Sequence, residues 1–249
     1  MDTLKSKKTN RVLLGVITFV LLLIIQEILV RVPGLIADSV PYRKFDPFDS
    51  FAGNFIHHAA MLILALVIIL VPGKLMNLDF YFQLGDKKRG FRYLAIFTAV
   101  FALISVLQHT YMVLSDSLPV YSFPLDAKNI IGTLGFQLLL TGPAEELTFR
   151  ALTITLLIRA FGKSIRIKCS FTLEVILASI LFSFAHVSWS IVTLHFKADY
   201  FQLIYALIMG MIQGIAYQKT KSILYPVLMH SFSNVLMVGG GYVFTALFS

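Results

Sequence analysis

Long apolar stretches dominate this chain and limit what it can fold into. About seven of them approach or exceed the roughly 20 residues that cross a bilayer as a helix. Only 14% of the 249 residues are charged, whereas soluble domains carry about a quarter. Lipid offers the backbone no hydrogen bonds, so only helices and closed barrels cross it, and these stretches lack the alternation of barrel strands. The spans are expected at about 12–30, 54–72, 93–114, 129–161, 174–192, 200–217 and 222–238.

The sequence therefore predicts an all-α fold, a polytopic transmembrane helical bundle with about seven spans. The last span is expected to end early, at Gly239-Gly240-Gly241. If the residues after these glycines re-enter the membrane, the number of spans rises to eight.

The formal net charge of +8 is explained by where the basic residues lie. Most of the 21 Lys and Arg residues precede the first span or lie in every second connection after it. Cytoplasmic loops carry such an excess, so the positive-inside rule places the N-terminus in the cytoplasm. The charge thus reflects topology, and it predicts a lipid bilayer and not a nucleic acid as partner.

The first span has a basic front, as a cleaved signal peptide would have. Its apolar run exceeds the roughly 7–15 residues of a signal core, and no small-residue cleavage site follows. We expect a retained anchor in a multi-pass protein of the plasma membrane. Residues 1–128 are expected to hold about three N-terminal spans, and residues 129–249 to form a catalytic core that carries the polar motifs.

The fourth span places three charges at membrane depth. Such charges are costly in lipid unless they have partners, water or a purpose. Glu146 and Arg150 are four residues apart on one helix face, so they can form an ion pair. Glu145 points elsewhere and lacks a local partner, which makes it a candidate general base. Gly142-Pro143 just upstream is expected to kink or restart the helix.

Two of the six histidines lie within predicted spans beside a second informative residue. Phe182 and His186 share a face of the fifth span, and His230 and Asn234 share a face of the seventh. The remaining histidines lie near a span end, in a loop, or far from any acid, and we assign them no function. They are His57, His58, His109 and His195.

Three spans together thus contribute a carboxylate, two imidazoles and an amide. Amide hydrolysis needs such a set, because one group must deprotonate water, others must hold that water or a metal, and a donor must stabilise the oxyanion. A proton-coupled transporter needs similar groups to relay protons, and spacing alone does not decide between the two. The single cysteine, Cys169, leaves His, Glu and Asp as ligands if a metal is bound.

Three motifs, in this order on separate spans, resemble the signature of a known family. It is the CAAX protease and bacteriocin-processing family of type II CAAX prenyl endopeptidase-like intramembrane proteases. The resemblance covers about residues 140–235. The motifs are Glu145-Glu146-x-x-x-Arg150, Phe182-x-x-x-His186 and His230-x-x-x-Asn234.

The resemblance implies a role for each motif residue. Glu145 would activate the attacking water, and Asn234 would stabilise the oxyanion. His186 and His230 would orient the water or coordinate a metal. The residues that would support the site, with the aromatic ring packing and not reacting, are Glu146, Arg150 and Phe182.

By this resemblance the protein is expected to be an intramembrane endopeptidase that cleaves a peptide precursor or a membrane-associated protein. Two schemes stay open, a glutamate-dependent one without metal and a zinc-dependent one with Glu145, His186 and His230 as ligands. The composition is similar to that of Gram-positive bacterial members. Some relatives are non-proteolytic regulators or immunity proteins, but those usually lack motif residues that this chain keeps.

Overall fold

The computed structural model describes residues 2–190 and 195–248. Within them, five helices are long and apolar enough to cross a membrane, judged by length and composition. These helices are α1 (Asp2–Ser39), α2 (Ala52–Met76), α3 (Lys87–Leu114), α8 (Tyr200–Thr220) and α9 (Leu224–Phe248). Large aliphatic side chains such as Leu21, Val67 and Leu103 are exposed on their outer faces. The predicted helical membrane bundle is confirmed, and the chain is a multi-pass membrane protein.

Another long helical run, residues 127–161, passes through the middle of the bundle. Two π-helical turns interrupt the α-helix of this run. The pieces are α4 (Ala127–Phe136), a π turn (Gln137–Thr141), α5 (Gly142–Glu146), a second π turn (Leu147–Leu152) and α6 (Thr153–Phe161). Such wide turns within α-helices are frequent at functional sites.

Gly142 sets how closely the central helix approaches α9. The break expected at Gly142-Pro143 takes the form of a change from π- to α-helical turns, and the backbone stays helical. A Cβ atom at position 142 would overlap with Ser231 Oγ and would lie 2.6 Å from the Val227 carbonyl oxygen. Only glycine therefore allows α5 and α9 to pack at this distance.

The predicted fifth span is wrong in its second half. Helix α7 (Leu173–Phe184) is shorter than expected and is followed by strand β3 (Ser188–Ser190), which pairs antiparallel with β4 (His195–Lys197). The indole N–H of Trp189 donates to Glu27 Oε1 of α1 at 3.3 Å, so this segment bonds to a neighbouring helix instead of extending α7. Residues 191 and 192, which the prediction included, lie outside the described residues. A second small hairpin, β1 (Arg166–Lys168) with β2 (Phe171–Thr172), precedes α7.

The expected early end of the last span is also wrong, because α9 continues to Phe248. The glycines serve packing instead. A Cβ atom at Gly240 would lie 2.5 Å from Ser105 Oγ of α3. Small residues at this point let α3 and α9 lie close together, as in other membrane bundles.

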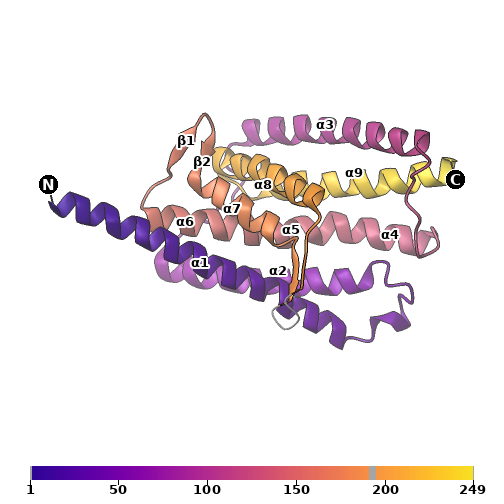
Figure 1. The fold of residues 1–249 in the computed structure, drawn as a ribbon, viewed down its shortest axis with the longest axis horizontal. Coiled ribbons are helices and arrows are strands. Elements are labelled where there is room, and N and C mark those ends of the chain that lie inside the picture. The colour runs from indigo at the N-terminus through magenta and orange to yellow at the C-terminus, as the bar shows by residue number, and fades with distance from the viewer. Residues whose placement is uncertain (1, 191–194, 249) are drawn as a thin grey trace.

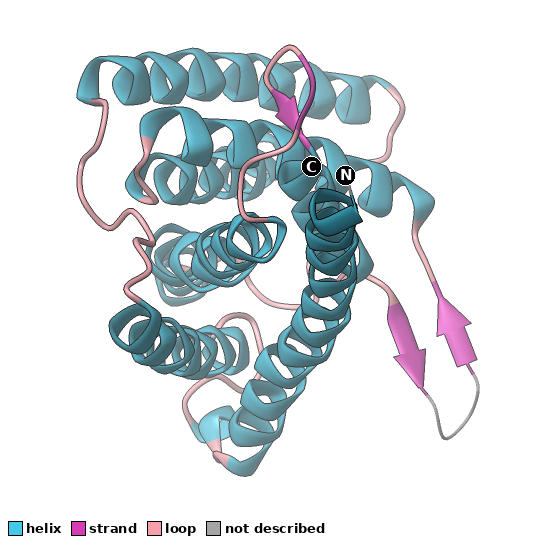
Figure 2. Cartoon of the chain, turned by 90° about the vertical axis from the view of Figure 1, so that its left-hand side faces the viewer, coloured by secondary structure: helices cyan, strands magenta, loops and turns pink. Residues whose placement is uncertain are grey.

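The helices form layers around the central run. Figure 1 shows α1 and α2 side by side along one edge and α3 with α9 along the other, with α4, α5 and α6 between them. Helices α7 and α8 pack against each other across one face. Figure 2 shows the β3–β4 hairpin projecting from the side of the bundle. Carboxylates on the central run are thus within reach of side chains from α2 and from α9.

The loop between α1 and α2 is held by a buried carboxylate, Asp46. Asp46 Oδ2 accepts hydrogen bonds from the backbone N–H groups of Phe51 at 2.8 Å and Ala52 at 2.9 Å. Ser50 Oγ donates to Asp46 Oδ1 at 3.0 Å. Burial alone would raise the pKa of Asp46, but these hydrogen bonds outweigh it and lower the pKa below its ordinary value.

A stability measurement tests this anchor. Because the folded-state pKa lies below the ordinary value of about 4, the contribution of Asp46 is complete above that pH and is lost as the pH falls through the lowered pKa. We expect the unfolding temperature of the detergent-solubilised protein to fall on acidification below about pH 4. Asp46→Asn should lower the unfolding temperature at pH 7 and reduce this acid dependence. An unchanged acid dependence in Asp46→Asn would contradict the assignment.

Candidate active site

A polar cavity of about 300 Å³ lies between α2, the central run, α7, α8 and α9. All four residues that the motifs nominate for catalysis line it, although they come from three separate parts of the chain. They are Glu145, His186, His230 and Asn234. The cavity also contains residues that the motifs do not include, among them His58, Gln137 and Gln213.

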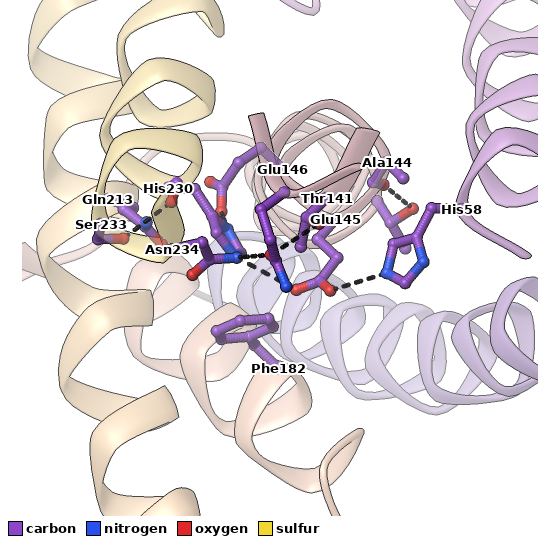
Figure 3. Close-up of polar contacts among 12 residues, drawn as sticks. His58, Thr141, Ala144, Glu145, Glu146, Phe182, Gln213, His230, Ser233 and Asn234 are labelled. Carbon is purple, nitrogen blue, oxygen red and sulfur yellow. Dashed lines mark hydrogen bonds and ion pairs between the residues drawn. The ribbon is translucent and has the colours of Figure 1, made fainter. Parts of the chain in front are cut away.

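Glu145 lies between two imidazole rings, one from each side of the bundle (Figure 3). Its Oε1 is 3.4 Å from His58 Nε2, and its Oε2 is 3.7 Å from His230 Nε2. The Glu145 side chain is 17% exposed, so it is accessible from the cavity while largely enclosed by protein. The sequence left this carboxylate without a partner, whereas the fold supplies a histidine on either side.

Glu146 is fully buried and serves as a structural link. Its Oε2 is 3.1 Å from Arg150 Nε, so the predicted ion pair is present. Its Oε1 accepts a hydrogen bond from His230 Nδ1 at 2.7 Å. The Arg150 guanidinium also donates to Gln213 Oε1 of α8 and lies 4.1 Å from the centre of the Phe182 ring. This arrangement compensates the buried charges with ionic, amide and cation–π partners.

The two motif histidines have one ring nitrogen fixed and the other free for the cavity. His230 Nδ1 bonds to Glu146, as described, and His186 Nδ1 bonds to the Phe182 carbonyl oxygen at 2.9 Å. Since both partners are acceptors, each Nδ1 carries a hydrogen. Each Nε2 is then left to bind water or substrate.

His186 does not lie within a span, contrary to the prediction. Helix α7 ends at Phe184, and His186 belongs to the turn that follows, where its backbone N–H bonds to the Ser183 carbonyl oxygen at 3.1 Å. This turn, which joins α7 to β3, places the imidazole in the lining of the cavity. Phe182, still on α7, is 4% exposed and meets the His186 ring edge-on at 4.9 Å, so it packs as expected.

Asn234 is oriented by a residue of the first π turn. Its Nδ2 donates to Gln137 Oε1 at 2.8 Å, and Gln137 Oε1 also accepts from Thr141 Oγ1 at 3.1 Å. An amide nitrogen has two hydrogens, so one of those on Asn234 stays free to donate into the cavity. Nothing in the local sequence pattern indicated Gln137.

The four histidines that were assigned no function separate into three groups. His58 lines the cavity and contacts Glu145, a position that its sequence pattern did not indicate. His109 is buried in α3, bonds to the Ser105 carbonyl oxygen at 2.7 Å, and like His57 is not part of the cavity lining that the structure describes. The side chain of His195 lies outside the described part of the chain.

A zinc scheme would use Glu145, His186 and His230 as ligands. Among the described residues, no group of three or more His, Cys, Asp or Glu side chains is arranged to hold a metal ion. Each catalytic zinc site needs three protein ligands at about 2 Å from one point. The side chains of the described residues, as positioned, do not fit that requirement.

The fold defines a multi-pass helical membrane protein, and a comparison with known families specifies its kind. Residues 127–236 match the model of the family described as type II CAAX prenyl endopeptidase Rce1-like. The chain therefore contains an Rce1-like domain, and the resemblance noted in the sequence is confirmed. The family is one of CAAX intramembrane proteases. No curated protein and no solved structure matches the chain.

Proposed function

We propose that this protein is an intramembrane endopeptidase in which Glu145 activates the water that attacks a peptide bond. The position of Glu145 carries the proposal. Among the described residues that line the cavity, it is the one carboxylic acid. Glu146 is fully buried and already engaged by Arg150 and His230. One carboxylate is therefore held in place by its partners, while its neighbour is accessible for proton transfer.

The reaction proceeds in two balanced steps. Glu145 takes a proton from water as the water oxygen attacks the carbonyl carbon, so that a C–O bond forms and the π electrons move to the carbonyl oxygen. The tetrahedral oxyanion then collapses, the C–N bond breaks, and Glu145 returns the proton to the leaving nitrogen. Water and an amide become a carboxylic acid and an amine, and Glu145 is regenerated.

The remaining cavity residues orient the reactants. In a neutral ring with a hydrogen on Nδ1, the Nε2 atom of His186 or of His230 accepts a hydrogen bond from the water hydrogen that Glu145 does not take. The free Nδ2 hydrogen of Asn234 donates to the oxyanion, and such a donor contributes about 10²–10³-fold to the rate in other hydrolases. The bond to Gln137 fixes Asn234 before substrate arrives, which removes the cost of orienting it during the reaction.

The substrate in this proposal is a peptide precursor or a membrane-associated protein. The enzyme lies in the plasma membrane of a bacterium with its N-terminus in the cytoplasm. Residues 129–249 form the catalytic core, and residues 1–128 supply the N-terminal helices. The location of the cavity between helices supports cleavage close to or within the bilayer.

Peptide termini in cells test this function. Membranes and medium from cells with wild type should contain termini that are missing when His186→Ala is present at the same abundance. His109→Ala replaces a buried histidine outside the cavity lining, so it is the matched control and should give the wild-type termini. Termini are compared by mass spectrometry after labelling of free amino groups.

Identical termini in all three strains would overturn the proposal. A phenotype that still separates wild type from His186→Ala in that case would make proton-coupled transport the leading explanation of the polar cavity. Termini found only with wild type and His109→Ala would establish proteolysis and identify candidate substrates together.

A further inference from the structure

The cavity contains an imidazole that comes from outside the family-matched segment, residues 127–236. His58 lies on α2, and its Nε2 is 3.4 Å from Glu145 Oε1. The side chains of the two residues are 13% and 17% exposed, so the contact is largely shielded by protein. No Lys or Arg among the described residues lies within ion-pair distance of Glu145, and the side chains beside its carboxylate oxygens are imidazoles.

The His58 ring has a fixed orientation. Its Nδ1 is 2.9 Å from the Asn54 carbonyl oxygen, one helical turn earlier on α2. Its edge meets the Phe136 ring with the centroids 4.9 Å apart and the planes at 66°. The bond to Asn54 fixes the rotation of the ring, and the Phe136 ring fills the space beside it. The direction of Nε2 is therefore determined by the position of α2 relative to α4.

The hydrogen positions follow from these partners. A carbonyl oxygen only accepts, so Nδ1 of His58 carries a hydrogen. A carboxylate oxygen accepts, so a hydrogen bond from His58 to the ionised Glu145 is donated by Nε2.

We propose that His58 is a positioning residue for the base Glu145, and that the site is completed by the N-terminal helices. His58 holds Oε1 from α2, so that Oε2 stays directed towards His230 and available to the attacking water. A glutamate has three rotatable side-chain bonds, and an unheld carboxylate would have to be ordered in each reaction cycle. A displacement of about 1 Å at a reacting group can cost about 100-fold in rate. This inference rests on the proposed function of Glu145.

Two substitutions separate a positioning role from simple packing. His58→Phe keeps an aromatic ring against Phe136 but has no donor for Glu145. His58→Gln loses the ring but places an amide N–H the same number of bonds from Cβ as Nε2 of histidine. His57→Phe is the matched control, because the same change is made one residue away and outside the cavity lining.

The test uses the purified full chain and a peptide that spans a cleavage site found in the terminus comparison. His58→Phe should lower kcat by about 100-fold with KM unchanged, because the base is misplaced while binding is not. His58→Gln should recover at least about tenfold of that loss, and His57→Phe should equal wild type. An unchanged kcat in His58→Phe, or a His58→Gln variant no faster than His58→Phe, would overturn the proposal.

A second readout does not depend on activity. The infrared band of the Glu145 carboxylate, identified by its loss in Glu145→Gln, should shift in His58→Phe and not in His57→Phe. If the wild-type protein cleaves no peptide, the proposed function fails and this band alone decides the role of His58. An unshifted band in His58→Phe would show that the contact does not hold the carboxylate.

Discussion

Purified Glu145→Gln is expected to cleave its peptide at least about 10³-fold more slowly than wild type, within the range that general bases contribute. The amide has nearly the shape of the carboxylate but cannot take a proton from water. Because Glu145 is 17% exposed to the cavity and forms no ion pair with Lys or Arg in the described chain, its loss should leave the fold intact. The measurement is kcat and KM for a peptide substrate, together with the unfolding temperature of each variant.

Glu145→Asp tests whether activity depends on the position of the carboxylate as well as on its presence. It keeps a carboxylate but withdraws it by one methylene from His58 and His230, whose Nε2 atoms lie 3.4 and 3.7 Å from the native oxygens. We expect an activity between those of wild type and Glu145→Gln. A Glu145→Gln variant within tenfold of wild type would mean that another group takes the proton from the water.

The membrane helices could be predicted from the sequence because the bilayer imposes one length on every span. The apolar stretches predicted the positions of α2, α3 and α8 closely, and the start of α9, whereas α1 continues past the expected end at residue 30 to Ser39. The errors arose where length was not the deciding factor. Helix α7 ends at Phe184 since the following segment pairs as a strand and bonds through Trp189 to α1, and no local signal encodes a partner about 160 residues away.

In the site, contacts within one helix could be predicted from the sequence, whereas contacts between distant parts of the chain could not. Helical spacing predicted the Glu146–Arg150 pair, because residues four apart face each other whatever surrounds the helix. It could not predict the bonds from Glu146 to His230 or from Asn234 to Gln137, which join positions 84 and 97 residues apart. The two π turns also rotate the central run relative to a regular α-helix, so a constant angle per residue misplaces the faces beyond them.

His58 shows what single motifs miss. It opens α2 beside a second histidine and has no acid within one helical turn, so its pattern is that of an interfacial residue. Only the packing of α2 against the central run brings it to Glu145. A polar side chain near a span end is therefore better judged against every span that could pack on it than against its own helix.

Replacing Arg150 with alanine is expected to reduce the amount of folded protein severely. The Glu146 and Arg150 side chains are 0% and 1% exposed, so the substitution leaves a buried carboxylate with His230 as its remaining partner. Removing one member of a buried ion pair costs about 3–5 kcal/mol, which is a large part of the roughly 5–15 kcal/mol by which native proteins are stable. Gln213 of α8 loses its partner as well. The measurement is protein abundance in membranes and the unfolding temperature of whatever can be purified.

Two further variants identify the cause. Arg43→Ala removes one member of an exposed pair with Asp49, whose side chains are 73% and 39% exposed, and should cost less than about 1 kcal/mol. The double variant Glu146→Gln with Arg150→Met removes both buried charges but keeps an oxygen that accepts from His230 Nδ1, so abundance should recover. If Arg150→Ala is as abundant as wild type, the pair does not hold the helices together. If the double variant is as scarce as Arg150→Ala, the loss comes from the contacts of Arg150 with Gln213 and Phe182 and not from the unpaired charge.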